Sequence, residues 1–344
     1  MLHFATYFDS NYLTRGLALL HSLKQHTKNP FTLYILALDK QVIIYFQKKN
    51  DINVVTINID DLEDHFPELA EAKKNRSTVE YYFTLSPFLP SYILEKFDDI
   101  DQVTTMDADL YFFDDPALIL ESYPHASILI TPHNFSPEMQ YLEIYGNYNV
   151  SFQSFKNNGE GWACLRDWKQ KCLEWCHDYL DEINHRFADQ KYLDSWKGRF
   201  DVRDIDIPGA GLAPWNIEKY NYSLRGKKVF VNGLPLIYFH FHHLRIFKGN
   251  FAVNGLRDYK VDVSQKAVKI IYHTYLKRLA SLSNINVVSD NNIERDVYKT
   301  GKSFMQRIND KNGYWFFTSY FIIHLNLSQP IQKIKRTLKY LLPG

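Results

Sequence analysis

Asp107 and Asp109 interrupt an apolar stretch that runs from Val103 to Phe113. In a strand, residues at i and i+2 point to the same side, so both carboxylates can face one ligand. Two such carboxylates repel each other unless a cation lies between them. Their oxygen atoms suit a hard divalent ion, Mg²⁺ or Mn²⁺, which commonly also binds substrate phosphates. The alternative is a polar turn after a strand, since Asp114-Asp115-Pro116 follows shortly.

The elements that must position these carboxylates begin at the start of the chain. Strands are expected at 2–8, 31–38 and 53–57, and helices at 13–26 and 41–49. Strands that alternate with helices predict a parallel sheet with right-handed crossovers. Ligands of such sheets bind beyond the carboxyl ends of the strands. Asp9 and the pair Asp107/Asp109 are therefore expected at the same edge of the sheet.

The middle of the chain continues this alternation. We expect a helix over 77–94 that is interrupted at Pro87 and Pro90, a strand over 147–155, a long helix over 161–185, a helix at 189–194, a loop around 209–216 and a strand over 236–242. Cys164, Cys172 and Cys176 fall in this long helix, and their odd number predicts reduced buried thiols rather than a disulfide framework.

Composition describes an ordinary globular protein. Of the residues, 45% are hydrophobic and 23% charged, and the 40 basic and 39 acidic side chains nearly cancel, so no general affinity for nucleic acid follows. The chain does not open with a basic and apolar signal sequence, and no apolar run reaches the roughly 18 residues of a membrane span. We expect a cytoplasmic protein.

The character of the chain changes beyond about residue 258. We predict one domain over 1–257 and a mainly helical region over 258–344. The final segment interleaves apolar residues with Lys333, Lys335, Arg336 and Lys339 and carries no acid. It can lie on an anionic membrane surface, or pack as an amphipathic helix on the protein's own core. Flotation with anionic liposomes at low salt separates these two possibilities. No oligomeric state is predicted.

Four motifs in order carry a resemblance to a known family. They are Phe4-Ala5-Thr6-Tyr7-Phe8-Asp9, Asp107-Ala108-Asp109, Phe187-Ala188-Asp189-Gln190-Lys191-Tyr192-Leu193-Asp194 and His240-Phe241-His242. Together they resemble a nucleotide-sugar glycosyltransferase of the GT-A fold, similar to the family 8-like enzymes of bacterial surface polysaccharide synthesis. The resemblance runs from Phe4 to about Lys248. It implies an α/β fold with a Rossmann-like, mostly parallel sheet flanked by helices and a helical C-terminal extension.

The resemblance also implies an activity and a metal. The enzyme would move a sugar from a UDP-sugar to a saccharide or lipid-linked acceptor, with retention of configuration. Asp107 and Asp109 would bind a divalent metal that bridges the diphosphate. His240 would be the third ligand, with His242 as the alternate. Carboxylates combined with an imidazole favour Mn²⁺ over Mg²⁺.

Further residues match the donor side of the family's site. Thr6, Tyr7 and Asp9 resemble the segment that receives the uracil and ribose, although Asp9 alone reads as a helix cap. Asn149 matches an Asn of the pocket between donor and acceptor.

Two more motifs would face the sugar and the acceptor. Asp189 would orient sugar hydroxyls and Gln190 would lie near the reacting face; the alternative for Asp189 is an N-cap. Trp215 would form a wall for the acceptor, because its ring offers an apolar face and an N–H. The alternative for Trp215 is a buried core residue.

Three departures from the family keep other functions open. Ser151 stands where many members have Gly, Thr84 where an Arg is expected, and His243 where a Gly follows the last motif. They favour, as one alternative, a catalytically silent protein that binds nucleotide or sugar. Another alternative is a sugar nucleotidyltransferase, which needs a Gly-rich basic loop after the first strand, where this chain has Asp9-Ser10-Asn11-Tyr12.

Overall fold

The chain divides into two compact units, Met1–His240 and Phe241–Gly344. The computed structural model describes residues 1–247, 251–282, 314–317 and 322–325. The domain boundary expected near residue 257 stays a prediction.

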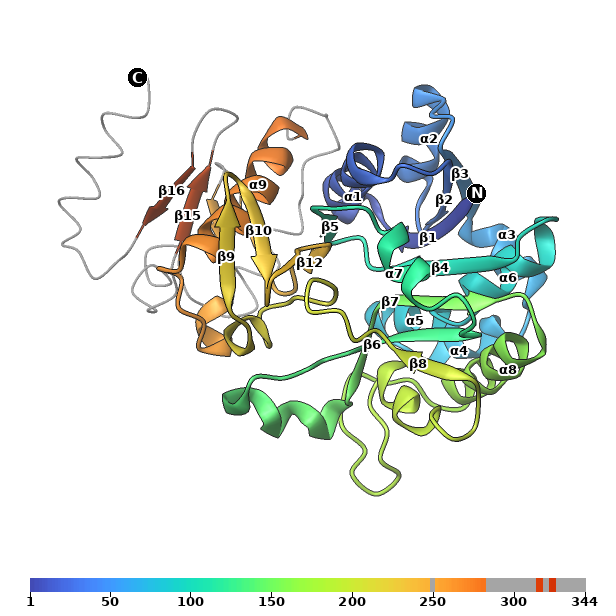
Figure 1. Ribbon diagram of the computed structural model, residues 1–344. Coiled ribbons are helices and arrows are strands. Elements are labelled where there is room, and N and C mark those ends of the chain that lie inside the picture. Colours follow the sequence, from blue (N-terminus) through green and yellow to red (C-terminus); the bar gives the residue numbers. More distant parts are fainter. Residues whose placement is uncertain (248–250, 283–313, 318–321, 326–344) are drawn as a thin grey trace, which may run out of the picture. The chain divides into compact units, whose positions relative to one another are not determined.

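A seven-stranded sheet forms the centre of the first unit (Figure 1). Its strands are β1 (Leu2–Phe8), β2 (Phe31–Ala37), β3 (Val54–Asn58), β4 (Gln102–Met106), β6 (Ile128–Pro132), β7 (Tyr148–Lys156) and β8 (Val202–Asp204). They lie in the order β3-β2-β1-β4-β7-β6-β8. β7 runs antiparallel to β4 and β6, whereas the other neighbouring pairs are parallel. The expected mostly parallel α/β sheet flanked by helices is confirmed.

Helices flank this sheet on its buried faces. They are α1 (Leu13–His26), α2 (Lys40–Lys49), α3 (Ile59–His65), α4 (Leu69–Asn75), α5 (Thr78–Leu85), α6 (Phe88–Lys96), α7 (Ala117–Ser122) and α8 (Gly159–Glu174). One core cluster joins α5, α6 and α8 to the sheet, with Phe88, Trp168 and Phe155 fully buried in it. Strands covered by helices read as nearly continuous apolar runs, as Phe31–Ala37 does.

The helix expected over 77–94 is two helices, and one of its two prolines causes the break. Pro87 separates α5 from α6, as predicted. Pro90 was also expected to interrupt the helix, but it lies inside the first turn of α6. The backbone N–H groups of a first turn have no hydrogen-bond acceptor within the helix, so a proline there removes no bond. The predicted interruption at Pro90 is therefore wrong.

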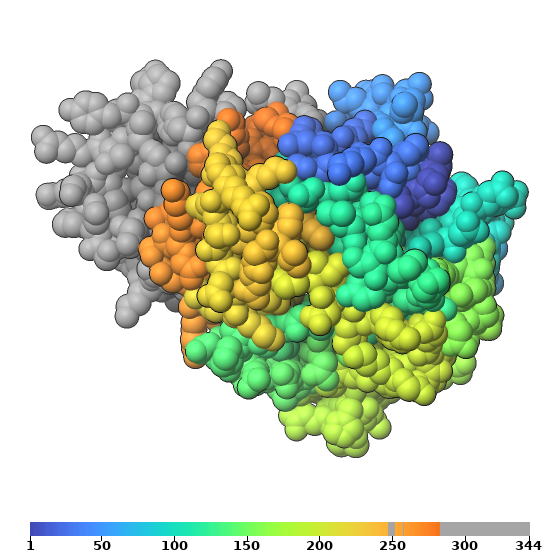
Figure 2. Space-filling view, in the orientation of Figure 1, coloured from blue at the N-terminus to red at the C-terminus, as the bar shows by residue number. Residues whose placement is uncertain are grey.

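The helix expected over 161–185 also differs, because α8 ends at Glu174. The Arg76 guanidinium donates to the carbonyls of Cys172 (3.3 Å) and Leu173 (3.1 Å), which caps the helix. The chain then forms a surface segment, coloured yellow-green, that stands out at the lower edge of the view (Figure 2). Ile183, which belongs to this segment, is 90% exposed. All three cysteines are buried free thiols, as expected.

Two small sheets complete the first unit. β5 (Leu110–Phe112) pairs antiparallel with β12 (Tyr238–His240), and β9 (Tyr222–Arg225), β10 (Lys228–Val231) and β11 (Leu234–Pro235) form an antiparallel sheet. The pair β5–β12 matters for function, because β5 directly follows the two aspartates and places Leu110 opposite His240.

The second unit contains α9 (Lys266–Leu282) and an antiparallel sheet in the order β13 (Arg245–Phe247), β14 (Phe251–Val253), β15 (Tyr314–Phe317) and β16 (Ile322–Leu325). Phe241 stacks on Tyr275 with ring centroids 3.8 Å apart. Among the described helices none is both long and apolar enough to cross a membrane. The basic segment with Lys333, Lys335, Arg336 and Lys339 lies outside the described residues.

Candidate metal and donor site

Asp107 and Asp109 lie in a tight turn between β4 and β5. The Leu110 N–H donates to the Asp107 carbonyl at 3.2 Å, and the Asp107 N–H donates to the Ser151 carbonyl at 2.9 Å. The strand conformation that we expected to align the two side chains is therefore absent. The turn brings the two carboxylates close to the same imidazole instead.

His240 faces both carboxylates. Its Nε2 atom lies 3.2 Å from Asp109 Oδ1 and 3.6 Å from Asp107 Oδ2. One ligand atom from each of the three residues lies within 4.8 Å of the other two. Two carboxylates and an imidazole that converge in this way fit a divalent cation of the Mn²⁺ or Mg²⁺ class. His242, the alternate, belongs to the second unit, where its ring stacks on His243.

The electrostatics of this cluster favour a bound cation. Burial raises the pKa of Asp107 to about 6, the charge of His240 opposes this shift, and the neighbouring Asp109 adds to it. Burial by itself would lower the pKa of His240, but Asp109 and Asp107 raise it above its usual value. Without a cation, Asp107 thus holds a proton below about pH 6 and His240 keeps its proton to a higher pH than an ordinary imidazole, and a divalent ion would take the place of these protons.

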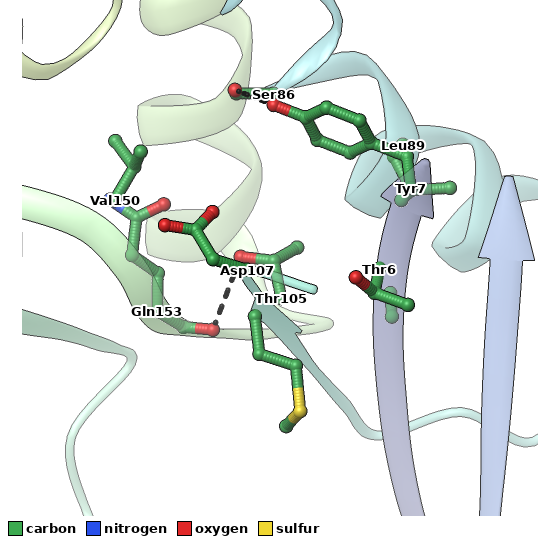
Figure 3. A pocket seen from close by; sticks show the side chains of 10 residues that line it. Thr6, Tyr7, Ser86, Leu89, Thr105, Asp107, Val150 and Gln153 are labelled. Atoms are coloured by element: carbon green, nitrogen blue, oxygen red, sulfur yellow. Dashed lines mark hydrogen bonds between the residues drawn. The ribbon is translucent and has the colours of Figure 1, made fainter. Parts of the chain in front are cut away.

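A pocket opens beside Asp107 at the carboxyl ends of β1 and β4 (Figure 3). Its lining comes from β1, the junction of α5 and α6, the end of β4 and β7, namely Ala5, Thr6, Tyr7, Ser86, Leu89, Thr105, Met106, Asp107, Val150 and Gln153. None of these described lining residues is a lysine or an arginine. The Tyr7 ring crosses the pocket, and its hydroxyl bonds the Ser86 hydroxyl at 3.0 Å.

Asp189 lies at the start of the 3-10 helix Gln190–Ser195, but its side chain makes no cap hydrogen bond. It is 2% exposed, and burial raises its pKa to about 7, with a smaller contribution from the charge of Asp107. The N-cap alternative therefore does not explain this carboxylate. The Gln190 amide donates to the Tyr145 carbonyl at 3.0 Å.

Four buried polar atoms in this region have no hydrogen-bond partner among the described residues. They are Thr6 Oγ1, Asn149 Nδ2, Gln153 Nε2 and Asp189 Oδ2. Each of these side chains is at most 4% exposed. A buried polar atom without a partner costs about 1–3 kcal/mol, so a group of them indicates a polar ligand that completes the bonds.

The other predicted residues lie as follows. Asp9 caps the 3-10 helix Ser10–Tyr12 by accepting from the Asn11 N–H at 3.0 Å, which confirms the helix-cap alternative and leaves its contact with uracil a prediction. Trp215 is 5% exposed, and its ring meets His240 edge-to-face, so the buried alternative holds. Its contact with an acceptor stays a prediction.

Two relatives from Bacillus subtilis (strain 168) match most of the chain. The uncharacterized protein YfnD is 32% identical over 279 residues, which cover 80% of this chain and 88% of YfnD. The uncharacterized protein YfnF is 31% identical over 256 residues, which cover 72% of this chain and 83% of YfnF. The chain belongs to the YfnD family. No protein-family model matches the sequence.

Solved glycosyltransferase structures align with this YfnD-family chain at low identity. Mouse xyloside xylosyltransferase 1 aligns over 70% of this chain and 98% of its own, with 12% identity and a TM-score of 0.45. The galactosyltransferase LgtC, in complex with donor and acceptor sugar analogs, aligns over 84% of this chain and 98% of its own, with 12% identity and a TM-score of 0.48.

Two departures from the GT-A pattern have a clear place in the YfnD-family structure. Thr84 is fully buried in α5, where its hydroxyl donates to the Glu80 carbonyl. The Ser151 hydroxyl and N–H both donate to Asn149 Oδ1, which fixes the Asn149 amide. Thr84 therefore leaves the site without the arginine expected at this position. Ser151 occupies the oxygen of the Asn149 amide, so that Asn149 Nδ2 is the amide atom without a partner among the described residues.

Sequence reasoning missed Ser86 and Gln153. Ser86 lies at the junction of α5 and α6 and bonds Tyr7, whereas Gln153 reaches the pocket from within β7. Neither lies in one of the four motifs. A signal for Gln153 existed, since a glutamine in a strand expected at the centre of the sheet requires a hydrogen-bond partner.

Proposed function

We propose that this protein is a metal-dependent glycosyltransferase that moves a hexosyl group from a UDP-sugar to a saccharide or lipid-linked acceptor. The observation that carries this proposal is the convergence of Asp107, Asp109 and His240 beside a pocket. Two residues that line this pocket, Thr6 and Gln153, have a buried polar atom without a hydrogen-bond partner among the described residues. The order of motifs shared with GT-A transferases supports the donor assignment.

Asp107, Asp109 and His240 would hold the metal ion, with Mn²⁺ favoured over Mg²⁺. When bound, the ion neutralises the charge that develops on the departing nucleoside diphosphate. This contribution is needed here, because no described residue of the pocket lining supplies a cationic side chain.

The chain's own residues would orient the donor. The unpaired amide groups of Asn149 and Gln153 can donate to sugar or ribose hydroxyls, and the Thr6 hydroxyl can donate or accept. Asp189, with a pKa of about 7, can accept from a sugar hydroxyl when ionised. Each bond formed removes the cost of an unpaired buried atom, so the pocket favours a hydroxyl-rich ligand over an apolar one.

Retention of configuration is part of the proposal. It rests on the resemblance to family 8-like enzymes, in which the residue that corresponds to Gln190 would lie near the reacting face of the sugar. The test is the anomeric configuration of the first product, measured by NMR before mutarotation. An inverted product would contradict retention without affecting the donor assignment.

The decisive experiment measures UDP release from a panel of UDP-sugars, with Mn²⁺ and with chelator. We expect release with at least one donor, slow without acceptor, which is lost with chelator and in Asp109→Ala. The matched control is Asp114→Ala. This residue follows β5 in the same acidic stretch but is not one of the three clustered ligands, so its variant should keep the activity.

The alternatives predict other results. A catalytically silent binding protein would bind UDP in a metal- and Asp109-dependent manner without turnover of any donor and acceptor pair. A nucleotidyltransferase would make UDP-sugar from a sugar phosphate and UTP. No binding of any nucleotide would refute the proposal altogether.

A further inference from the structure

The strand that carries His240 is held on both of its edges. On one side β12 pairs with β5 (Figure 1). On the other, the His240 N–H donates to the Leu212 carbonyl at 2.8 Å, and the Ile237 N–H donates to the Gly209 carbonyl at 2.7 Å. The segment 209–216 thus runs directly beside the metal-ligand strand.

A glycine allows this segment to lie so close to the sheet. Gly211 has φ +79°, a left-handed conformation that side chains disfavour. A Cβ atom there would come within 2.9 Å of Thr131 Cγ2 on β6. The segment therefore contacts Thr131 of β6 and bonds to β12, and this position brings Trp215 next to His240.

The Trp215 ring packs against the imidazole of His240. The ring centroids are 5.3 Å apart and the planes are at 90°. Trp215 also meets His133, with ring centroids 5.1 Å apart and planes at 71°, and His133 stacks on Phe135 at 4.6 Å and 12°. The indole that packs against His240 is therefore itself held by a second aromatic contact.

This wall carries no positive charge toward the metal site. Burial, aided by the charge of His240, lowers the pKa of His133 to about 3, so its ring is neutral at pH 7. Trp215 is likewise neutral and is 5% exposed. Because Trp215 and His133 are both neutral, they can restrain the orientation of His240 without repelling a cation bound by His240.

Asn216 fixes the backbone under the indole. Its Oδ1 accepts from the Ala213 N–H at 3.0 Å, and its Nδ2 donates to the carbonyls of His133 and Gly211, each at 2.9 Å. The Trp215 carbonyl accepts from the Ser136 N–H at 3.1 Å. Asn216 is 1% exposed, so these bonds are shielded from water.

We propose that Trp215 is a positioning residue that holds the His240 imidazole so that Nε2 faces Asp107 and Asp109. The inference rests on the metal site of the proposed function. Groups that hydrogen-bond a metal ligand and so orient it typically contribute 10- to 100-fold to metal affinity, and we expect a packing contact to act at the lower end of this range. This role differs from the wall for the acceptor, because it acts before any substrate is present.

The test measures the Kd for Mn²⁺ of the full chain without nucleotide or acceptor, from the EPR signal of the free ion. We expect Trp215→Leu to weaken binding by about 10-fold. Trp215→Phe keeps an aromatic edge against His240 and should recover most of the affinity. The matched control is Trp196→Leu, a fully buried Trp that packs on Phe155 and Trp168, which should lower the melting temperature but leave the Kd unchanged.

The outcomes separate this inference from the proposed function. If wild type binds Mn²⁺ and folded Trp215→Leu binds it equally well, positioning is refuted while the transferase proposal stands. A raised KM for acceptor in that variant would then assign Trp215 to the acceptor. If wild type binds no divalent ion, both proposals fail. If Trp215→Leu and Trp196→Leu lose affinity alike, the effect is general destabilisation and positioning is again refuted.

Discussion

Asp189 shows how burial gives a residue a different role from the one that its sequence position predicts. Asp before a short helix is a common N-cap, yet this side chain makes no cap bond and its Oδ2 has no partner among the described residues. Burial raises its pKa to about 7. The fold therefore tolerates a buried carboxylate whose pKa is raised, as is common at functional sites.

This raised pKa predicts an effect on stability with a defined sign. The unfolded carboxyl ionises near pH 3.8 and the folded one near pH 7, so between these values the folded state binds more protons. The contribution is thus most favourable below pH 3.8 and is lost as the pH rises through 7. We expect Asp189→Asn to raise the free energy of unfolding at pH 8 by roughly 2–4 kcal/mol, and by much less at pH 4. Urea unfolding at both pH values measures this.

Asp167 supplies a control of opposite sign. Burial alone would raise its pKa, but hydrogen bonds from Arg199 and Lys171 lower it below its usual value. Asp167→Asn should therefore cost stability at pH 8 and less at low pH. Equal effects of the two substitutions at both pH values would contradict the raised pKa of Asp189.

Residue types alone predicted two of the three residues of the metal cluster. The spacing of Asp107 and Asp109 within an apolar stretch pointed to a cation, although the expected strand is a turn. His240 was reached through the order of family motifs, because nothing local shows that β12 pairs with β5. Ser86 and Gln153 could not be found from a motif, since their role depends on contacts with Tyr7 and the pocket that only the tertiary structure creates.

At the scale of elements, helix boundaries depend on partners far along the chain. The apolar pattern of α8 continues into Trp175 and Cys176, which is why a longer helix was expected. Arg76, located between α4 and α5, ends it by binding its last carbonyls. Beyond the end, Glu80 accepts from the His177 ring and the Asp178 N–H, which holds the chain away from a helical path.

Removal of this cap should loosen the end of α8. We expect Arg76→Met to lower the free energy of unfolding by about 1–3 kcal/mol, because two charge-assisted bonds to helix carbonyls and a favourable interaction with the helix dipole are lost. Hydrogen exchange of amides around residues 172–178 should become faster. Arg166→Met, on the exposed side of α8, is the control and should change neither quantity. Unchanged exchange in Arg76→Met would show that the cap is dispensable.

At the scale of the first unit, the antiparallel strand β7 completes the site. Parallel strands bring only their carboxyl ends to the ligand edge, and these supply Thr6 and Asp107. Because β7 runs the other way, its beginning lies beside the end of β4, and the Asp107 N–H bonds the Ser151 carbonyl. Asn149 is thereby placed at the same edge. The alternation of strands and helices predicted the parallel part of this sheet, but not the reversal that adds Asn149.

Because the ligands of the metal and the unpaired polar atoms belong to one unit, their occupation should stabilise that unit as a whole. A ligand at 100 times its Kd contributes about 2.7 kcal/mol, or roughly 5–10 °C in melting temperature for a domain of this size. We expect UDP with Mn²⁺ to give such a shift at pH 7.5 in differential scanning fluorimetry, and UDP with chelator to give none. The shift should shrink at pH 5.5, because Asp107, with a pKa of about 6, then holds a proton and the raised pKa of His240 keeps its imidazole charged. Asp109→Ala should abolish the shift and Asp114→Ala should keep it, whereas a shift equally large with chelator would mean that nucleotide binds without the metal cluster.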